Sequence, residues 1–308
     1  MCIRDRDRGD GSSHCLFDSV RGAGKWLGSD SNAAEQTGYE NVYNPSFDND
    51  GFGVGSDGAT NGNGSPYVAW CWKANGEQTV VNNDGSITSQ VSVNQTAGFS
   101  IVKFTGDGGS SSTVGHGLSK APSFIISKNT ENTYGWAIYH QSTQNTGSAA
   151  TDVVYLNDNI VGNADNIRSV NDTTFAPTSW GGVNQSTKTH INYCWTEIEG
   201  FSRFSSYLGN GVGDGPFVYC GFRPAFVIIK NVSAQGEWCI WDSSRTPHNE
   251  MQYALRSNSP DQDVDGFQFD FLCNGFKARD TESSVNTNGS RYIFAAFAES
   301  PFKTANAR

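Results

Sequence analysis

Short apolar and aromatic segments alternate with turns rich in Gly, Asn and Ser along the whole chain. Residues 124–129 and 226–231 each begin with a continuous apolar run, which is typical of strands that are covered on both faces. Residues 267–272 alternate Phe with mainly polar residues, and this spacing predicts a half-buried strand. No segment has the apolar spacing of an amphipathic helix. The pattern therefore predicts an all-β protein.

The strand pattern that closes the chain occurs three times. Landmarks in the later units keep one period, because Ala137 and Cys239 lie 102 residues apart and Cys194 and Ala296 also lie 102 residues apart. A chance similarity would not preserve one spacing at two distant places. The three copies of the pattern occupy residues 67–74, 191–201 and 292–299.

Each unit contains roughly seven short strands in about 100 residues, with turns every 8 to 12 residues, and this density is typical of sandwich folds. We therefore expect tandem antiparallel β-sandwich repeats of about 100 residues that are jelly-roll-like. The Asp84-Gly85 turn between two apolar runs predicts a β-hairpin in the segment that joins the first two repeats. The expected divisions are a first repeat at 1–73, the connector at 74–97, a second repeat at 98–203 and a third at 204–308.

The first repeat is expected to be truncated at its N-terminus. It begins near His14, whereas the later copies have two strands before the matching point. Residues 1–6, Met-Cys-Ile-Arg-Asp-Arg, resemble a translated sequencing-adapter fragment. We therefore expect residues 1–6 to be non-native and exclude them from fold reasoning.

Charge and hydropathy exclude two classes of partner. The chain carries 21 Lys and Arg against 31 Asp and Glu, a formal net charge of -10, and no window gathers enough basic residues to follow a phosphate backbone. Nucleic-acid binding is therefore not expected. No run of 18 apolar residues is present, so no membrane span is predicted, and no secretory signal pattern is found.

The seven cysteines form no Cys-x-x-Cys pair, so neither a zinc site nor a disulfide framework is indicated. Cys71 and Cys194 occupy the same place in two copies of the closing strand, and Cys15 and Cys239 are equivalent in another strand. Equivalent positions in separate units do not usually face each other. Small, buried, free thiols in a reducing compartment are therefore expected.

One acidic run has part of the pattern of a calcium loop. Asp261, Asp263 and Asp265 place three carboxylates on alternate residues ahead of Gly266. The position of the bidentate Glu is occupied by Leu272, and the second repeat has no counterpart of the run. A solvated acidic turn is the alternative interpretation. Calcium is the one cofactor considered, and no other is expected.

Glu197 and Glu199 lie on one face of a strand, as paired acids do in sandwich-fold glycosidases. In the other copies of that strand Glu299 and Ala74 stand at the position of Glu197, which favours a structural role. The five histidines are scattered, and no Ser has the context of a nucleophile elbow. We therefore expect no enzyme, and a glycan depolymerase is the alternative that these acids leave open.

Asp18 and Arg21 share their three-residue spacing with Asp242 and Arg245, and both pairs follow an aromatic strand. Because Arg matches a carboxylate bidentately, each pair is expected to be a structural ion pair that fixes the turn after its strand. A ligand pocket is the alternative. Exposed aromatic residues such as Trp26, Trp180 and Tyr43 are candidates for stacking on sugar rings, although most Trp and Tyr in such a chain belong to its core.

Five groups of motifs stand out, at residues 84–91, 98–102, 115–118, 215–219 with 221–226, and 296–303. Together they resemble a domain-of-unknown-function family of marine bacteriophage and metagenomic viral proteins. The resemblance runs from about Cys15 to the end of the chain. Its departures are the missing N-terminal strands and the acidic run at 261–265.

The resemblance implies a non-enzymatic virion structural protein, in a tail fibre or another appendage that faces the host. It implies a location in the virion, after assembly in the cytoplasm of a bacterial host. The expected partners are other virion proteins, further copies of this chain, and a glycan or protein of the host surface, which loops on a rigid scaffold would bind. A purely architectural role in the virion is the alternative.

Overall fold

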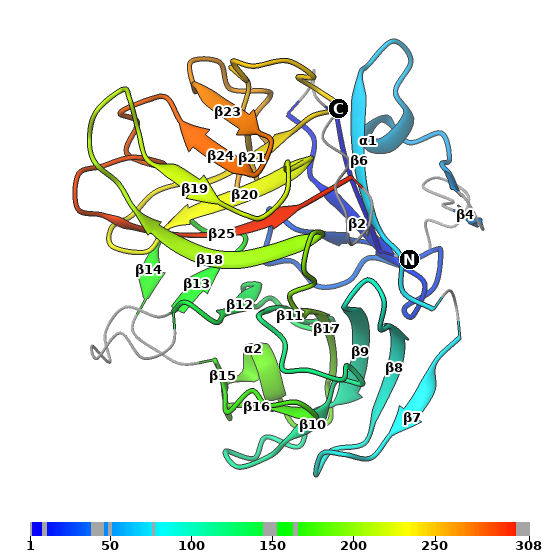
Figure 1. Ribbon diagram of the computed structural model, residues 1–308. Coiled ribbons are helices and arrows are strands. Elements are labelled where there is room, and N and C mark those ends of the chain that lie inside the picture. The colour runs from blue at the N-terminus through cyan, green and yellow to red at the C-terminus, as the bar shows by residue number, and fades with distance from the viewer. Residues whose placement is uncertain are drawn as a thin grey trace.

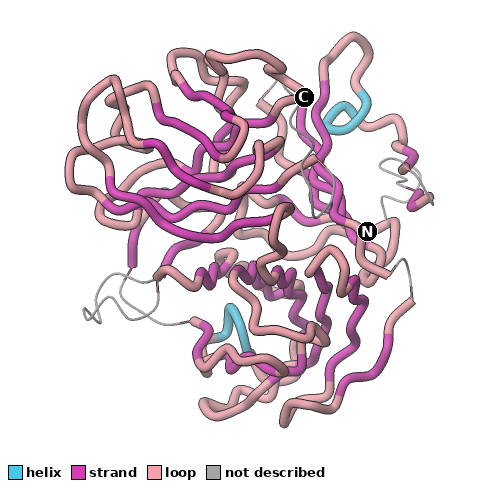
Figure 2. Tube along the Cα trace, in the orientation of Figure 1, coloured by secondary structure: helices cyan, strands magenta, loops and turns pink. Residues whose placement is uncertain are grey.

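The structure is a computed structural model that describes residues 2–7, 11–37, 46–48, 51–75, 78–143, 153–162 and 166–299. Short antiparallel strands joined by turns make up almost all of these ranges, which confirms the all-β prediction (Figures 1 and 2). The two described helices, α1 (Gly58–Asn61) and α2 (Gly181–Asn184), are single turns, and no described helix is long and apolar enough to cross a membrane. The side chain of Asp57 caps α1 by accepting a hydrogen bond from the Ala59 amide at 2.8 Å.

The first of three large sheets has four strands and lies at the right of Figure 1. Its strand β1 pairs with both of its neighbours along its length. A separate hairpin of β4 (Ser46–Phe47) and β5 (Phe52–Gly53) belongs to the same part of the chain. In spatial order the sheet contains β3 (Leu27–Gly28), β2 (Cys15–Asp18), β1 (Cys2–Asp7) and β6 (Tyr67–Trp72).

The second large sheet has eight strands, and a three-stranded sheet faces it in a sandwich at the bottom of Figure 1. The hairpin predicted in the connector is formed by β7 and β8, and it extends this sheet by pairing with β9. The order of the large sheet is β14 (Val161–Gly162), β13 (Val153–Tyr155), β12 (Ala137–His140), β11 (Phe124–Asn129), β17 (Thr189–Trp195), β9 (Phe99–Thr105), β8 (Ser89–Asn94) and β7 (Val80–Asn82). The order of the small sheet is β10 (Val114–Gly115), β16 (Thr174–Pro177) and β15 (Ile167–Arg168).

The third large sheet has five strands and also faces a three-stranded sheet, at the upper left of Figure 1. Its strand order follows that of β9-β17-β11-β12-β13 in the second sheet. The order of the large sheet is β18 (Ser202–Leu208), β25 (Arg291–Phe297), β20 (Phe226–Asn231), β21 (Trp238–Asp242) and β22 (Leu255–Arg256). The order of the small sheet is β19 (Phe217–Tyr219), β24 (Gly275–Ala278) and β23 (Phe269–Leu272).

Strand β1 lies between β2 and β6, just as β11 lies between β12 and β17 and β20 lies between β21 and β25. The three strands therefore have equivalent positions in their sheets. Strands β11 and β20 begin with apolar residues and are buried along their length. In contrast, β1 reads Cys-Ile-Arg-Asp-Arg-Asp, a sequence with four charged residues. The expectation that residues 1–6 are non-native stays a prediction.

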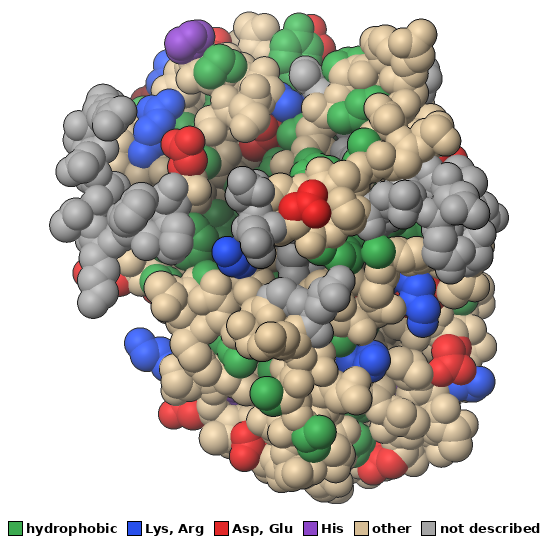
Figure 3. Space-filling model, turned by 90° about the vertical axis from the view of Figure 1, so that its right-hand side faces the viewer, with side chains coloured by type: hydrophobic (Ala, Val, Ile, Leu, Met, Phe, Trp, Pro, Cys, Tyr) green, Lys and Arg blue, Asp and Glu red, His purple; other side chains and the backbone are tan. Residues whose placement is uncertain are grey.

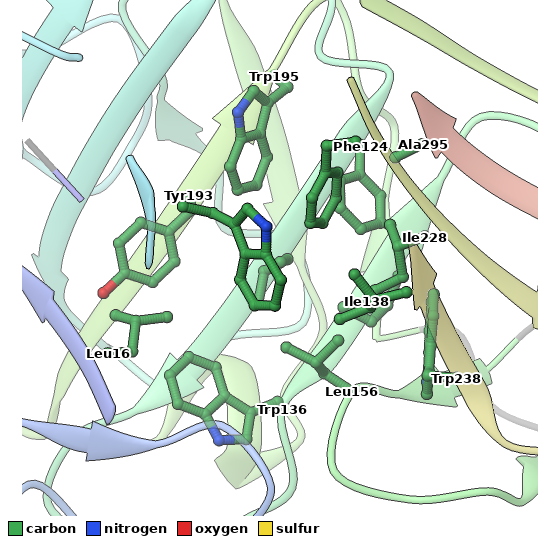
Figure 4. Packing of buried hydrophobic residues seen from close by; sticks show 14 of the residues in the cluster. Leu16, Phe124, Trp136, Ile138, Leu156, Tyr193, Trp195, Ile228, Trp238 and Ala295 are labelled. Atoms are coloured by element: carbon green, nitrogen blue, oxygen red, sulfur yellow. The ribbon is translucent and has the colours of Figure 1, made fainter. Parts of the chain in front are cut away.

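One hydrophobic cluster joins the three large sheets face to face (Figure 4). Leu16 of β2, Phe124 of β11 and Ile228 of β20 belong to it. Trp72 of β6 meets the other sheets edge-on, with ring centroids 5.8 Å from Trp195 and 5.7 Å from Phe226. Two further clusters lie between each of the second and third large sheets and the small sheet that faces it. Each of these two large sheets therefore buries one face in the shared core and the other against its own small sheet.

A ring of hydrogen bonds closes around this shared core. We call the parts of the chain that form the first, second and third large sheets the first, second and third units. Trp136, which precedes β12, donates its Nε1 proton to the carbonyl of Gly28 in the first unit at 2.9 Å. Trp238 in the third unit donates in the same way to Tyr155 in the second at 2.8 Å. His14 occupies the equivalent position in the first unit, and its Nε2 lies 2.8 Å from the carbonyl of Ser259 in the third. Each unit is thus fixed to the next, and the third is joined back to the first.

Buried lysines add to two of these contacts. Lys128 of β11 donates to the carbonyl of Asn32 in the first unit at 3.4 Å, and Lys230 of β20 donates to Asn159 in the second at 2.9 Å. Both side chains have no exposed surface. Burial lowers the pKa of each ammonium group to about 8. Carbonyl oxygens replace the water that these groups lose, so the lysines bind the loop of a neighbouring unit.

The cysteines with described side chains are free, as predicted, but not all of them are buried. Cys194 is covered because β17 lies between β9 and β11 under the small sheet. The equivalent Cys71 is exposed, and Cys273 is exposed in the turn between β23 and β24. Among the described residues β6 pairs only with β1, so it lacks the cover that β17 has. The prediction of burial was therefore wrong for Cys71 and Cys273.

The ring of hydrogen bonds can be tested with a Trp238→Phe variant. This change removes the Nε1 donor and leaves the carbonyl of Tyr155 without that bond. Trp241→Phe is the matched control, because Trp241 is equally buried and its Nε1 has no hydrogen-bond partner among the described residues. Urea unfolding should show a loss about 1–2 kcal/mol larger for Trp238→Phe. Equal losses would contradict a stabilising role for this bond.

Buried histidines should make stability depend on acid. The amide of Ser142 donates to His140 Nδ1 at 3.1 Å, and His140 Nε2 lies 3.0 Å from the carbonyl of Phe294, so the neutral ring satisfies both contacts. Burial lowers the pKa of His140 to about 4, and it does the same for His190. Between pH 6.5 and pH 4 the unfolded chain therefore binds more protons than the folded protein does. The free energy of unfolding should consequently decrease as the pH is lowered through this interval.

The expected loss is on the order of 2–3 kcal/mol for each histidine across this interval. Urea unfolding of a His140→Gln variant at several pH values should give a shallower dependence than the wild type gives. His248→Gln, at an exposed position, is the control and should keep the wild-type slope. A slope unchanged in His140→Gln would refute the assignment.

Candidate functional site

A surface cleft of about 740 Å³ lies between the first unit and one face of the second large sheet. Side chains directly opposite each other in an antiparallel pair share a face of the sheet. Lys103 of β9 is opposite both Gln90 of β8 and Ile191 of β17, and these three residues form one row of the floor. Thr105 and Thr189 form a second row towards the strand ends. The floor is therefore mixed, with polar side chains beside the apolar Ile191.

The first unit supplies a charged wall. Arg21 donates its Nε proton to Asp18 and an Nη1 proton to Glu35 at 3.1 Å. Its Nη2 donates to the carbonyl of Leu16 at 3.0 Å, and Lys25 lies 3.3 Å from the other oxygen of Glu35. Burial alone would lower the pKa of Arg21, but attraction to Asp18 and Glu35 raises it above its ordinary value. This wall is therefore a fixed ionic network.

Glu131 forms part of the opposite wall. Its Oε1 accepts a hydrogen bond from the Thr189 amide at 2.8 Å, and its Oε2 lies 3.0 Å from Lys188 Nζ. The hydrogen bond from the Thr189 amide, and after it the hydrogen bond from Lys188, lower the pKa of Glu131 below its ordinary value. Thr37, Thr88 and Thr130 also line the cleft, together with the apolar Ala34, Val81 and Phe104. The cleft thus offers hydrogen-bond donors and acceptors to a polar ligand.

Both predicted ion pairs are formed. Besides the contact of Arg21 with Asp18, Arg245 Nε lies 2.5 Å from Asp242 and its Nη1 lies 3.0 Å from Asp263. In each pair the Asp also accepts a hydrogen bond from the amide of its Arg. The pair of the first unit lies behind the cleft, with Arg21 in the lining, so the structural and the pocket interpretation meet there.

The three carboxylates considered for calcium have different neighbours. Asp263 is paired with Arg245, Asp261 lies 3.5 Å from Arg256, and Asp265 accepts a hydrogen bond from the Gly266 amide. Val264 pairs with Ala254, which fixes this run beside β22. In the ranges that the structure describes, no group of three or more His, Cys, Asp or Glu is placed to hold a metal ion.

The acids considered for catalysis have a structural arrangement around the turn into β18. Arg203 Nη1 lies 2.5 Å from Glu197 Oε1, and the Phe204 amide donates to the other oxygen at 3.4 Å. Glu197 and Glu199 both follow the end of β17 at Trp195, and Glu199 is exposed in a turn. The prediction that the two acids lie on one face of a strand was therefore wrong. Both oxygens of Glu197 therefore have a partner in the same segment of chain.

Trp26 and Trp180, which the sequence suggested for sugar stacking, are not in the cleft lining. Trp180 packs on Tyr134 and Tyr155, with ring centroids 5.5 and 5.7 Å apart, and Trp26 is half-buried. Tyr43 lies outside the described residues. Charged side chains of both signs are interspersed on the face that Figure 3 shows, with no continuous basic patch.

Sequence reasoning did not find the cleft, because its lining comes from the first unit, the β7–β8 hairpin, β9 and the segments around 130 and 189. A local signal existed only for Arg21, through its spacing from Asp18. The hydroxyl and lysine side chains of the floor resemble any exposed strand residues until β8, β9 and β17 are aligned in register.

Comparison with known protein families matches residues 3–301 to the family described as "Domain of unknown function (DUF7483)". No curated protein and no solved structure matches the chain.

The buried network behind the cleft can be tested by Arg21→Lys. Lysine cannot reach Asp18, Glu35 and the Leu16 carbonyl together, so a buried carboxylate loses part of its compensation. Urea unfolding should show a loss on the order of 3 kcal/mol. Arg203→Lys is the control, because its pair with Glu197 is solvent-exposed and should contribute less than about 1 kcal/mol. Similar losses in the two variants would contradict this account.

Proposed function

The chain belongs to the family of the domain of unknown function DUF7483, and we propose that it is a non-enzymatic structural protein of a bacteriophage particle. We place it in a tail fibre or another host-attachment appendage, with the cleft as a binding site for a glycan of the host surface. The resemblance of its motifs to viral proteins supports the assignment to a virus particle. The cleft supports the binding role.

The observation that carries this proposal is a cleft of mixed polar and apolar lining whose walls and floor are held by ion pairs and hydrogen bonds. The ionic network of Arg21 holds one wall, the bonds of Glu131 hold the other, and three paired strands form the floor. Sugars present hydroxyl groups that both donate and accept hydrogen bonds, which suits a lining of Thr hydroxyls, Gln90 and charged groups. A fixed site costs little ordering on binding.

An architectural role is the second candidate, and the edge of the second large sheet favours it. Strand β7 has one described neighbour, β8, and exposes Val80 and Val81 by 57% and 65%. An exposed apolar edge can accept a strand of another chain. In this role the partner would be another virion protein or a further copy of this chain.

A glycan depolymerase that uses Glu197 and Glu199 is the third and least favoured role. Glu197 is engaged by Arg203 and by the backbone of Phe204, and neither acid lines the large cleft. Release of new reducing ends from a bound glycan would be the sign of this activity.

Binding to an array of bacterial surface glycans tests the proposal. Thr105→Trp places an indole on the floor of the cleft and should weaken binding by at least about tenfold, because the ligand volume is filled. Thr281→Trp, at an exposed turn of the third unit, should bind as the wild type does. Binding at background for correctly folded wild-type protein would reject attachment through glycans and favour the architectural role.

A further inference from the structure

Among the described residues, Lys103 is the one cation of the cleft lining that has no ion-pair partner. It is half-buried in the floor, between Gln90 and Ile191 in the register of the sheet. Within the described ranges its ammonium group makes no ion pair and no side-chain hydrogen bond. The other cations of the lining, Arg21 and Lys25, both contact Glu35.

The local charge balance is positive in an otherwise acidic chain. The connected groups of the cleft are four cations and three carboxylates, whereas the whole chain has a formal net charge of -10. The carboxylates are all engaged by cations other than Lys103. The cations are Arg21, Lys25, Lys103 and Lys188, and the carboxylates are Asp18, Glu35 and Glu131. One positive charge is therefore left for a ligand.

The groups beside Lys103 define the rest of that ligand. Thr105 and Thr189 lie one row further along the same face, and the amide of Gln90 lies beside the lysine. Hydroxyl and amide groups of this kind donate hydrogen bonds to hydroxyls and accept hydrogen bonds from them. A ligand that carries a carboxylate next to several hydroxyls satisfies both features, and hexuronic acid rings have this chemistry.

We propose that the cleft binds acidic glycans that contain hexuronic acids, with the ammonium group of Lys103 paired to a sugar carboxylate. This inference rests on the proposed glycan-binding role and adds the class of sugar. Lys103 supplies the charge selectivity, while the hydroxyl rows and Gln90 bind the ring. The contact is partly shielded from water, so it should be stronger than an exposed ion pair.

The experiment uses calorimetry with the full chain and matched ligands. Oligomers of galacturonate, glucuronate and alginate are each compared with the same oligomer after reduction of its carboxyl groups. The wild type should bind at least one uronate oligomer about tenfold or more tightly than its reduced form. Lys103→Met should lose this preference and keep the weaker binding of the reduced form. Lys73→Met, which removes an exposed cation outside the cleft, should behave as the wild type does.

The outcomes separate the two proposals. Equal binding of acidic and reduced oligomers, or an unchanged preference in Lys103→Met, would overturn the acidic selectivity while glycan binding stands. Binding of neutral array glycans but of no uronate oligomer would also overturn it. Binding of no glycan at all by folded wild-type protein would overturn both. Circular dichroism and the unfolding midpoint of each variant establish that it is folded.

Discussion

The packing of three sheets on one shared apolar core is the constraint on which the rest of the structure depends. The second and third large sheets are apolar on both faces, and their small sheets cover only one. The other face must be buried against a different unit, because exposed apolar surface is costly in water. The aromatic ring of Trp72 meets Trp195 and Phe226 at this junction, so it touches both other sheets. Each unit consequently contributes residues to one hydrophobic core that all three units share.

Apolar packing alone does not fix how the sheets are rotated against each other. Hydrogen bonds around the shared core fix this rotation. The side chains of His14, Trp136 and Trp238 each point to a backbone carbonyl of a neighbouring unit. A buried donor without an acceptor costs more than a hydrogen bond gains, so a wrong rotation is penalised at three places at once. The buried lysines act in the same sense, since each ammonium group needs the loop carbonyls of the next unit. The cleft inherits this rigidity, because it lies where the first unit meets the second.

Local pattern predicted what depends on neighbours in the sequence. Apolar runs, turn residues and three-residue spacing are local properties of the sequence. They were enough to predict the strands at 124–129 and 226–231, the Asp84-Gly85 hairpin and the two Asp-Arg pairs. The shared core was not found, because an inward-facing Trp72 looks like any strand aromatic until three sheets are placed together. The exposure of Cys71 was missed for a related reason: equivalence between repeats predicts position in a strand but not the neighbours that cover it.

The arrangement also explains why charge in the cleft differs from charge in the chain as a whole. An acidic surface repels an acidic polymer at long range, but this repulsion is screened beyond about 8 Å at physiological salt. Inside the cleft the distances are shorter and the walls exclude part of the solvent, so the nearest groups determine the interaction. There Arg21 and Lys25 compensate Asp18 and Glu35, and Lys188 compensates Glu131, which leaves Lys103 as the uncompensated charge among the described residues. An acidic protein can in this way select an acidic ligand at one site while it resists nonspecific adsorption of polyanions elsewhere.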